Sequence, residues 1–189
     1  MEVMLDLETL SVRPHAVILV IGAIKFNRYE KYSDQMDDKN LNKLDTFYRR
    51  ITINSCEEIG LHKDEDTVKW WFNQKDEVKY EALVNPDRVS LQDALKDFSI
   101  WFNKENNIKN RIYIWGNGSD FDISILGEAY KRCDIKIPWN FWLVRDLRTI
   151  LDVGNVRMCD LPQTKLHHAL YDCYRQIVGL QRSLSNLNM

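Results

Sequence analysis

Short segments of this chain place acidic or histidine side chains directly beside apolar runs. Asp6-Leu7-Glu8 ends an N-terminal apolar run, Phe121-Asp122 follows a later one, and His167 stands five positions before Asp172. Together they supply four carboxylates and one imidazole. Such a set can hold two divalent cations and provide a general base, which is what the hydrolysis of a phosphodiester requires.

The first acidic pair has the spacing of one strand face. Asp6 and Glu8 are two positions apart, so on a strand both side chains project to the same side and Leu7 to the other. Burying two neighbouring carboxylates costs several kcal/mol each unless a positive charge compensates them. A bound dication would do so. A solvent-exposed polar face of an edge strand would explain the same motif. The motif alone does not decide between a cation site and such an exposed face.

The second acidic position follows a turn bracketed by Gly116 and Gly118, which permit a sharp reversal or a positive φ. Asp122 is therefore expected at the carboxyl end of a strand and the amino end of a helix, where α/β proteins commonly build sites. The alternative is an aspartate that only caps the helix. Asp120 competes for the same role.

The third segment combines a histidine with an aspartate. On one regular helix five positions separate two side chains by roughly 140°, so His167 and Asp172 converge only if His167 lies in the lead-in to the helix. An imidazole there could deprotonate an attacking water. The alternatives are a surface His167-His168 pair beside a solvated aspartate, and His168 as the base.

In this order and spacing the motifs resemble the DEDD exonuclease superfamily in its histidine form, the DnaQ-like or DEDDh group. Asp6-Leu7-Glu8-Thr9 matches the first motif, Asp122 the second, and His167 with Asp172 the third. The string from Trp115 to Asp122 looks closest to the branch that includes the DexA exonuclease of T-even phages and a mycobacterial 3′–5′ exoribonuclease. The resemblance extends over about residues 1–180.

The resemblance implies an RNase H-like fold and a two-metal mechanism. Asp6, Glu8, Asp122 and Asp172 would bind two Mg²⁺ or Mn²⁺ ions, and His167 would be the general base. The segment 145–149 is also similar to that branch, but its residues alone do not indicate a role.

A second group of residues is expected to contact the substrate. On a helix Trp71 would join the core, whereas Trp70 would point away and could stack on a base; that both are core residues is the alternative. The resemblance also implies that Leu10 lies near a terminal base, while Asn117 stands one residue further from Asp122 than in the commoner family pattern. The candidate substrate-binding residues are Thr9, Leu10, Trp70, Trp71, Asn117 and Phe121.

Composition limits the class of protein. The 189 residues fit one domain (1–189), with 29% charged and 44% hydrophobic residues. The formal charge of -2 does not indicate a stable duplex binder. Four scattered cysteines without a C-x-x-C pair predict reduced thiols, and no leader or membrane span is visible. We therefore expect a soluble, cytoplasmic protein, and its frequent Asn and Lys suggest a phage or viral genome.

Apolar patterns and turn residues predict an α/β domain with a central mixed five-stranded sheet flanked by helices. Glycine, proline and capping residues mark the ends of the elements. The expected strands are 3–5, 17–26, 47–53, 111–115 and 139–145; the expected helices begin near Asp66 and Ser90 and cover 122–132, 148–151 and 165–184, with loops at 29–46 and 106–110.

The predicted function is metal-dependent 3′–5′ exonucleolytic hydrolysis that releases nucleoside 5′-monophosphates. The expected partner is single-stranded RNA or DNA with a free 3′ end; no membrane is expected, and a homodimer is compatible with the sequence. One alternative is a catalytically silent nucleic-acid-binding module on the same fold. The other is an RNase H-like endonuclease, which would cleave a circular strand.

Overall fold

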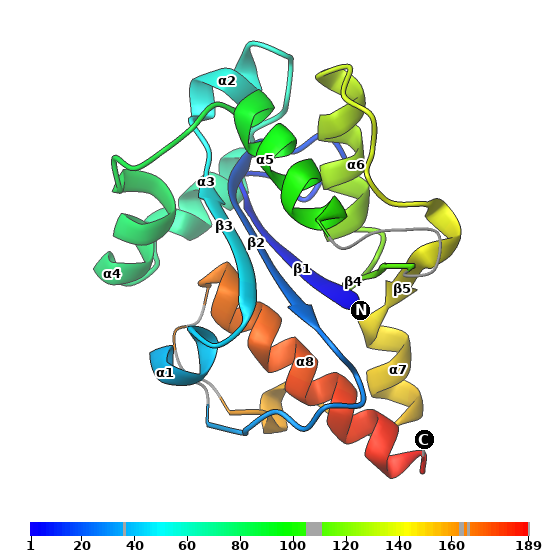
Figure 1. Ribbon diagram of the computed structural model, residues 1–189. Helices are drawn as coiled ribbons and strands as arrows, with labels where there is room; N and C mark the ends of the chain where they lie inside the picture. The colour runs from blue at the N-terminus through cyan, green and yellow to red at the C-terminus, as the bar shows by residue number, and fades with distance from the viewer. Residues whose placement is uncertain (36, 105–110, 163–164, 166, 189) are drawn as a thin grey trace.

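The computed structural model describes residues 1–35, 37–104, 111–162, 165 and 167–188 (Figure 1). Within these residues five strands form one mixed sheet, in the order β3-β2-β1-β4-β5. The strands are β1 (Glu2–Thr9), β2 (Ile18–Phe26), β3 (Asp45–Arg50), β4 (Tyr113–Gly116) and β5 (Val144–Asp146). The predicted central mixed five-stranded sheet is confirmed.

The sheet changes direction at its centre. β1 pairs antiparallel with β2, and β2 pairs antiparallel with β3. Residues 27–44, which contain α1, connect β2 to β3. β4 lies parallel to β1, and β5 parallel to β4, so each needs a longer crossover. All nine residues of β2 are buried, as its near-continuous apolar sequence predicts.

Helices cover both faces of the sheet (Figure 1). Apolar side chains of α5 and α6 pack on one face, and those of α7 and α8 pack on the other. The helices are α1 (Asp38–Leu41), α2 (Ile53–Glu57), α3 (Glu65–Phe72), α4 (Asp76–Lys79), the π-helix η1 (Tyr80–Val84), α5 (Leu91–Asn103), α6 (Asp122–Arg132), the 3-10 turn η2 (Phe141–Leu143), α7 (Leu147–Val153), the 3-10 turn η3 (Met158–Asp160) and α8 (Ala169–Asn186).

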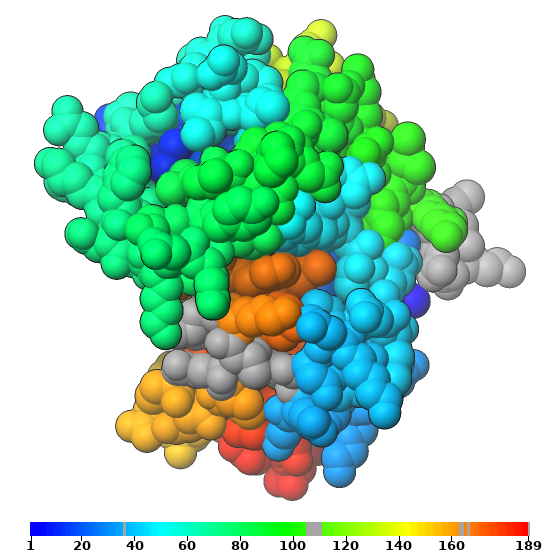
Figure 2. All heavy atoms as spheres, turned by 90° about the vertical axis from the view of Figure 1, so that its left-hand side faces the viewer, coloured from blue at the N-terminus to red at the C-terminus, as the bar shows by residue number. Residues whose placement is uncertain are grey.

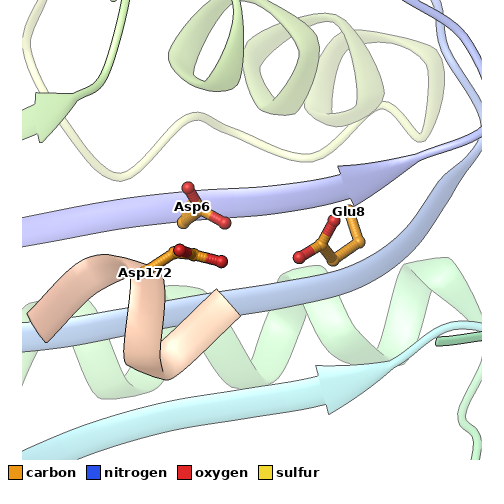
Figure 3. A group of neighbouring side chains, drawn as sticks. All are labelled: Asp6, Glu8 and Asp172. Carbon is orange, nitrogen blue, oxygen red and sulfur yellow. The ribbon is translucent and has the colours of Figure 1, made fainter. Parts of the chain in front are cut away.

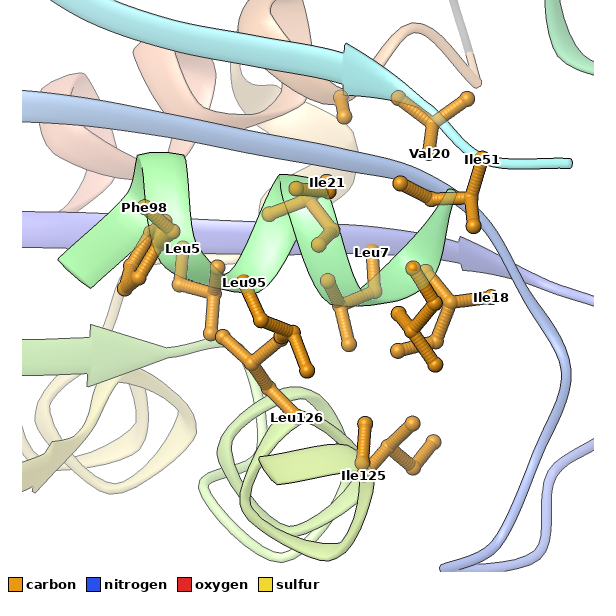
Figure 4. Close-up of a cluster of buried hydrophobic side chains, with 14 of the residues drawn as sticks. Leu5, Leu7, Ile18, Val20, Ile21, Ile51, Leu95, Phe98, Ile125 and Leu126 are labelled. Carbon is orange, nitrogen blue, oxygen red and sulfur yellow. The ribbon is translucent and has the colours of Figure 1, made fainter. Parts of the chain in front are cut away.

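The larger apolar cluster lies between the sheet and α5 and α6 (Figure 4). Leu5 and Leu7 point into it from β1, and Leu95 and Phe98 meet them from α5. Their spacing follows the periods of two and 3.6 residues that strands and helices require. This cluster holds β1 in place. The opposite face of the same strand carries Asp6 and Glu8, so their positions are set as well.

Several elements differ from the sequence prediction. Asp64, not Asp66, caps α3, because its side chain accepts the N–H of Asp66. The expected loop 29–46 contains α1 and the start of β3. The expected strand 139–145 is mostly the turn η2, and only Val144–Asp146 pairs with β4. The predicted cap of α5, Ser90, is confirmed. The predicted loop 106–110 lies outside the described residues.

In the described part of the chain, no helix combines the length and apolar character that crossing a membrane would need. The cysteines are free thiols: Cys56 and Cys173 are buried, Cys133 is half-buried and Cys159 is exposed.

Candidate active site

The acidic residues of β1 become part of a pocket once α8 is in place. Asp6 and Glu8 project from β1 toward Asp172 on the first turn of α8 (Figure 3). One carboxylate oxygen of each residue lies within 4.8 Å of one from each of the others. The same-face prediction for Asp6 and Glu8 is therefore confirmed, and the helix brings a third carboxylate from 166 residues after Asp6 in the chain.

Close packing of α8 on β2 sets this approach. Asp6 lies beside Gly22 in the β1–β2 register, and a Cβ at Gly22 would stand 2.5 Å from the Cβ of Ala169. Any side chain at position 22 would push away the first turn of α8, which carries Asp172. Gly22 is thus a requirement of the site, although the sequence presents it only as part of an apolar run.

Asp122 lines the same pocket, a cavity of about 300 Å³. It is the first residue of α6, and its Oδ1 accepts the backbone N–H of Leu7 at 3.1 Å. Its carboxyl is therefore anchored directly to the strand that carries Asp6 and Glu8. The competing Asp120 is exposed and is absent from the pocket lining.

The carboxylates share an environment that disfavours their charge. Burial, followed by repulsion from Asp122, Asp172 and Glu8, raises the pKa of Asp6 well above its ordinary value. Burial also raises the pKa of Glu8 and Asp172, and it raises the pKa of Asp122 to about 7 although N–H groups and Arg148 act in the opposite direction. Keeping four such groups together in their ionised forms costs free energy unless a positive charge compensates them.

The donor set fits a hard divalent cation. Mg²⁺ binds oxygen at about 2.1 Å, so two ligands on one ion are at most about 4.2 Å apart. The 4.8 Å spread of Asp6, Glu8 and Asp172 is within a small side-chain rotation of that limit. Gln176 supports this arrangement because its Nε2 donates to Asp6 Oδ1 at 2.7 Å and leaves the other oxygen of Asp6 free of this bond.

The two neighbouring histidines have different surroundings. His167 lines the acidic pocket in the lead-in to α8, with a left-handed φ of 56°. Its ring meets Trp70 edge to face at 4.8 Å. His168 instead stacks on Tyr48 at 5.0 Å and contacts Tyr171, away from the pocket lining. The convergence that the sequence required of His167 and Asp172 is therefore present, and it comes from the backbone turn before the helix.

A second cavity of about 440 Å³ shares Leu7, Glu8 and Phe121 with the acidic pocket. It is also lined by Thr9, Val12, Asp66, Thr67, Trp70 and Trp71. Trp70 is 42% exposed, whereas Trp71 is 1% exposed and its Nε1 donates to the carbonyl of Thr9 at 2.8 Å. Of the two tryptophans, Trp70 presents its ring to solvent, whereas the buried Trp71 joins α3 to β1 through its hydrogen bond to Thr9.

Two further sequence candidates have distinct positions. Asn117 lines the acidic pocket, and its Oδ1 is buried with no hydrogen-bond partner in the described residues.

Leu10 is 4% exposed and lines a separate apolar cavity of about 790 Å³ beside Trp71 and Phe72. On the face that carries α2 to α4, Figure 2 shows a hollow with dark-blue atoms of the N-terminal part at its bottom. Leu10 lines neither the acidic pocket nor the cavity beside Trp70, and its contact with a terminal base stays a prediction.

The pocket also contains residues to which the sequence alone assigned no role. Arg148, Arg175, Gln176 and Met158 complete its lining. Arg175 and Gln176 follow Asp172 by three and four positions on α8, the spacing that places side chains on one helix face. This spacing from Asp172 is the signal by which the sequence could have indicated Arg175 and Gln176.

Comparisons with known proteins agree with this geometry. A family model described as a 3′–5′ exoribonuclease Rv2179c-like domain matches residues 1–183. An exodeoxyribonuclease of enterobacteria phage T4 is 24% identical over 209 residues, which cover 95% of this chain and 87% of the phage protein.

Solved structures show the same fold. The nuclease domain of 3′hExo, described as a DEDDh family member bound to rAMP, has a TM-score of 0.57 and 16% identity, covering 97% of this chain and 91% of that one. A full-length 3′-exonuclease has a TM-score of 0.52 and 15% identity, covering 97% and 81%. The predicted RNase H-like fold is confirmed.

Proposed function

The chain belongs to the Rv2179c-like 3′–5′ exoribonuclease domain family, a group of 3′–5′ exonucleases, and from this premise we propose how it acts. It removes nucleotides one at a time from the 3′ end of single-stranded RNA or DNA and releases nucleoside 5′-monophosphates. Residues 1–189 act as a single exonuclease domain. The observation that supports this most strongly is the convergence of four carboxylates and His167 on one pocket.

Asp6, Glu8, Asp122 and Asp172 would hold two Mg²⁺ or Mn²⁺ ions. The mutual repulsion and burial of these groups support this role because cations would stabilise their ionised forms. When bound, the ions supply Lewis-acid stabilisation of charge on the phosphate oxygens. Leu7 and Gln176 keep two of the carboxylates in position through their hydrogen bonds.

His167 is the general base in this proposal. A ring nitrogen of His167 takes a proton from water while the water oxygen forms a bond to phosphorus. The bond between phosphorus and the 3′ oxygen of the preceding nucleotide breaks, and that oxygen leaves with the shortened strand. The edge-to-face contact with Trp70 restricts the orientation of the imidazole.

The terminal nucleotide would occupy the cavity next to Glu8. Trp70 and Phe121 offer aromatic faces there, and Thr9 and Leu7 supply part of the strand wall. Stacking is tolerant of base identity because every base has a π-face. The buried and unpaired Oδ1 of Asn117 offers an acceptor on the acidic-pocket side.

The test compares 5′-labelled single-stranded RNA and DNA of equal sequence with Mg²⁺, Mn²⁺ or chelator. We expect a ladder that shortens from the 3′ end by single nucleotides, 5′-monophosphates as products, and no reaction with chelator. The two sugars are compared because the family description names RNA and the phage relative is an exodeoxyribonuclease.

Two results would overturn the proposal. Cleavage of a circular single strand would identify an endonuclease. Tight binding that chelator does not change, without any product, would identify a silent binding module.

A further inference from the structure

Two arginines line the acidic pocket and have no part in the chemistry described above. Arg148 lies on the first turn of α7, and Arg175 lies on α8, one turn after Asp172. A cation-binding pocket has no use for arginines as ligands, since a guanidinium donates hydrogen bonds and accepts none. Their charges act on the neighbouring carboxylates Asp122 and Asp172, and their N–H groups can in addition bind an anion that lies close to the cations.

Arg175 is held by one end of its guanidinium. Nη2 donates to the carbonyl of Met158, and Nε is buried with no hydrogen-bond partner among the residues that the structure describes. A buried guanidinium N–H without a partner is unfavourable. The charge of Arg175 also lowers the pKa of Asp172, in opposition to the effect of burial.

Arg148 is positioned by the loop after β4. Gly118 has a φ of 98°, which favours glycine, and the guanidinium of Arg148 packs directly against it, because a Cβ there would stand 2.9 Å from Cζ of Arg148. Asp146 ties this loop to α7, because its carboxylate accepts the N–H groups of Ser119 at 2.7 Å and Thr149 at 2.9 Å. The loop after β4 and the first turn of α7 thus together place Arg148 at the pocket.

The two ends of the acidic pocket differ in character. The cavity proposed for the terminal nucleotide shares Leu7, Glu8 and Phe121 with the acidic pocket, and its lining includes neither arginine. From the lead-in of α8 into the helix, the order is His167 beside Trp70, then Asp172, then Arg175. A strand whose last nucleotide lies near Trp70 and whose scissile phosphate lies at the carboxylates therefore continues toward the arginines.

We propose that Arg148 and Arg175 bind the phosphodiester immediately 5′ of the scissile one. This inference rests on the proposed function and adds the contact that aligns the second nucleotide. The cations neutralise the scissile phosphate, but the next phosphate would face four carboxylates with no cation of its own. Two planar guanidinium forks offset that repulsion and match the geometry of phosphate oxygens.

The experiment places one neutral methylphosphonate in an otherwise normal oligonucleotide. It stands either at the linkage just 5′ of the scissile one or five linkages further upstream. Single-turnover measurements give kcat/KM for release of the first nucleotide. We expect the near substitution to lower this value for the wild type about 10–100-fold, and the distant one to leave it unchanged.

Arg175→Ala and Arg148→Ala should each lower kcat/KM on the normal strand and lose most of the sensitivity to the near methylphosphonate. Arg175→Lys and Arg148→Lys should recover part of both. Arg182→Ala is the matched control: Arg182 also lies on α8, but it pairs with Asp34 outside the pocket. It should behave as the wild type.

Arginine variants that are slow but keep the full methylphosphonate effect would overturn the inference, as would a wild type that is indifferent to the near substitution. The wild-type result decides the question even if an alanine variant does not fold. No cleavage of the normal strand by the wild type with either metal would instead refute the proposed function.

Discussion

The two faces of β1 place very different side chains on one strand. Val3, Leu5 and Leu7 enter the apolar cluster under α5 and α6. On the other face Met4 belongs to the apolar cluster under α8, but Asp6 and Glu8 follow it and meet Asp172. One face thus stabilises the fold, whereas part of the other carries charges that burial disfavours.

This contrast teaches that stability and activity are separable along a single element. Removing an apolar side chain from the first face leaves a cavity and lowers the free energy of unfolding. Removing a carboxylate charge from the second face relieves repulsion in the metal-free protein. Substitutions on the apolar face should therefore lower the melting temperature and leave turnover nearly unchanged, whereas those on the acidic face should lower turnover and leave the melting temperature equal or higher.

The largest expected effect is that of Asp172→Asn. It removes a cation ligand, and losing about 6 kcal/mol or more of transition-state stabilisation lowers turnover by more than about 10⁴-fold. The melting temperature of the metal-free protein should be equal or higher, because one repelling charge is gone. Turnover is measured with the labelled strand and folding by calorimetry; an unfolded Asp172→Asn protein would make that carboxylate structural.

His167→Ala comes next. Loss of a general base should slow turnover by roughly 10²–10⁴-fold, while Mn²⁺ affinity stays at the wild-type level. His15→Ala, which removes an imidazole outside the acidic pocket, serves as the control for both readouts. If His167→Ala abolished Mn²⁺ binding, His167 would be a ligand and the assignment as the base would be wrong.

Phe98→Ala tests the apolar face. Phe98 is fully buried and packs on Phe47 at 5.2 Å between ring centroids. Its truncation should lower the free energy of unfolding by about 3–5 kcal/mol, measured by urea titration. Below its new melting temperature the variant should retain near wild-type kcat. A large loss of kcat in the folded variant would show that the two faces are not separable.

The smallest expected effect is that of Trp70→Ala. Loss of one stacking contact, worth about 1–3 kcal/mol, should raise KM roughly 5–150-fold with little change in melting temperature. Phe72→Ala removes an exposed aromatic from the same helix, but Phe72 lines the separate apolar cavity, so its KM should not change. A fall in the melting temperature without a change in KM would make Trp70 structural.

The sequence predicted the parts of the site that depend on local periodicity. A spacing of two residues placed Asp6 and Glu8 on one face, and the 140° offset required His167 to precede the helix. Packing decided the rest. The close approach of α8 depends on Gly22, and the guanidinium of Arg148 packs against Gly118. Neither contact has a signature in the order of residues along the chain.

The same distinction explains the errors in the fold. Trp139–Arg145 has the composition of a strand, but its aromatic residues pack on α5 and α6 or form the turn η2, which leaves only Val144–Asp146 to pair. Asp66 resembled a helix cap because an acidic residue preceded an apolar helix face, yet Asp64 stands where the chain enters the helix. Local chemistry predicts that a cap exists, but the tertiary path selects the residue.

The most direct test of the acidic pocket measures Mn²⁺ binding and melting temperature together, without substrate. For the wild type we predict two Mn²⁺ ions per chain by titration calorimetry and a rise in melting temperature as they bind. Asp6→Asn should lose most of this binding and the associated rise while remaining folded. Equal Mn²⁺ binding and an equal rise in the wild type and in Asp6→Asn would contradict the claim that these carboxylates converge to hold cations.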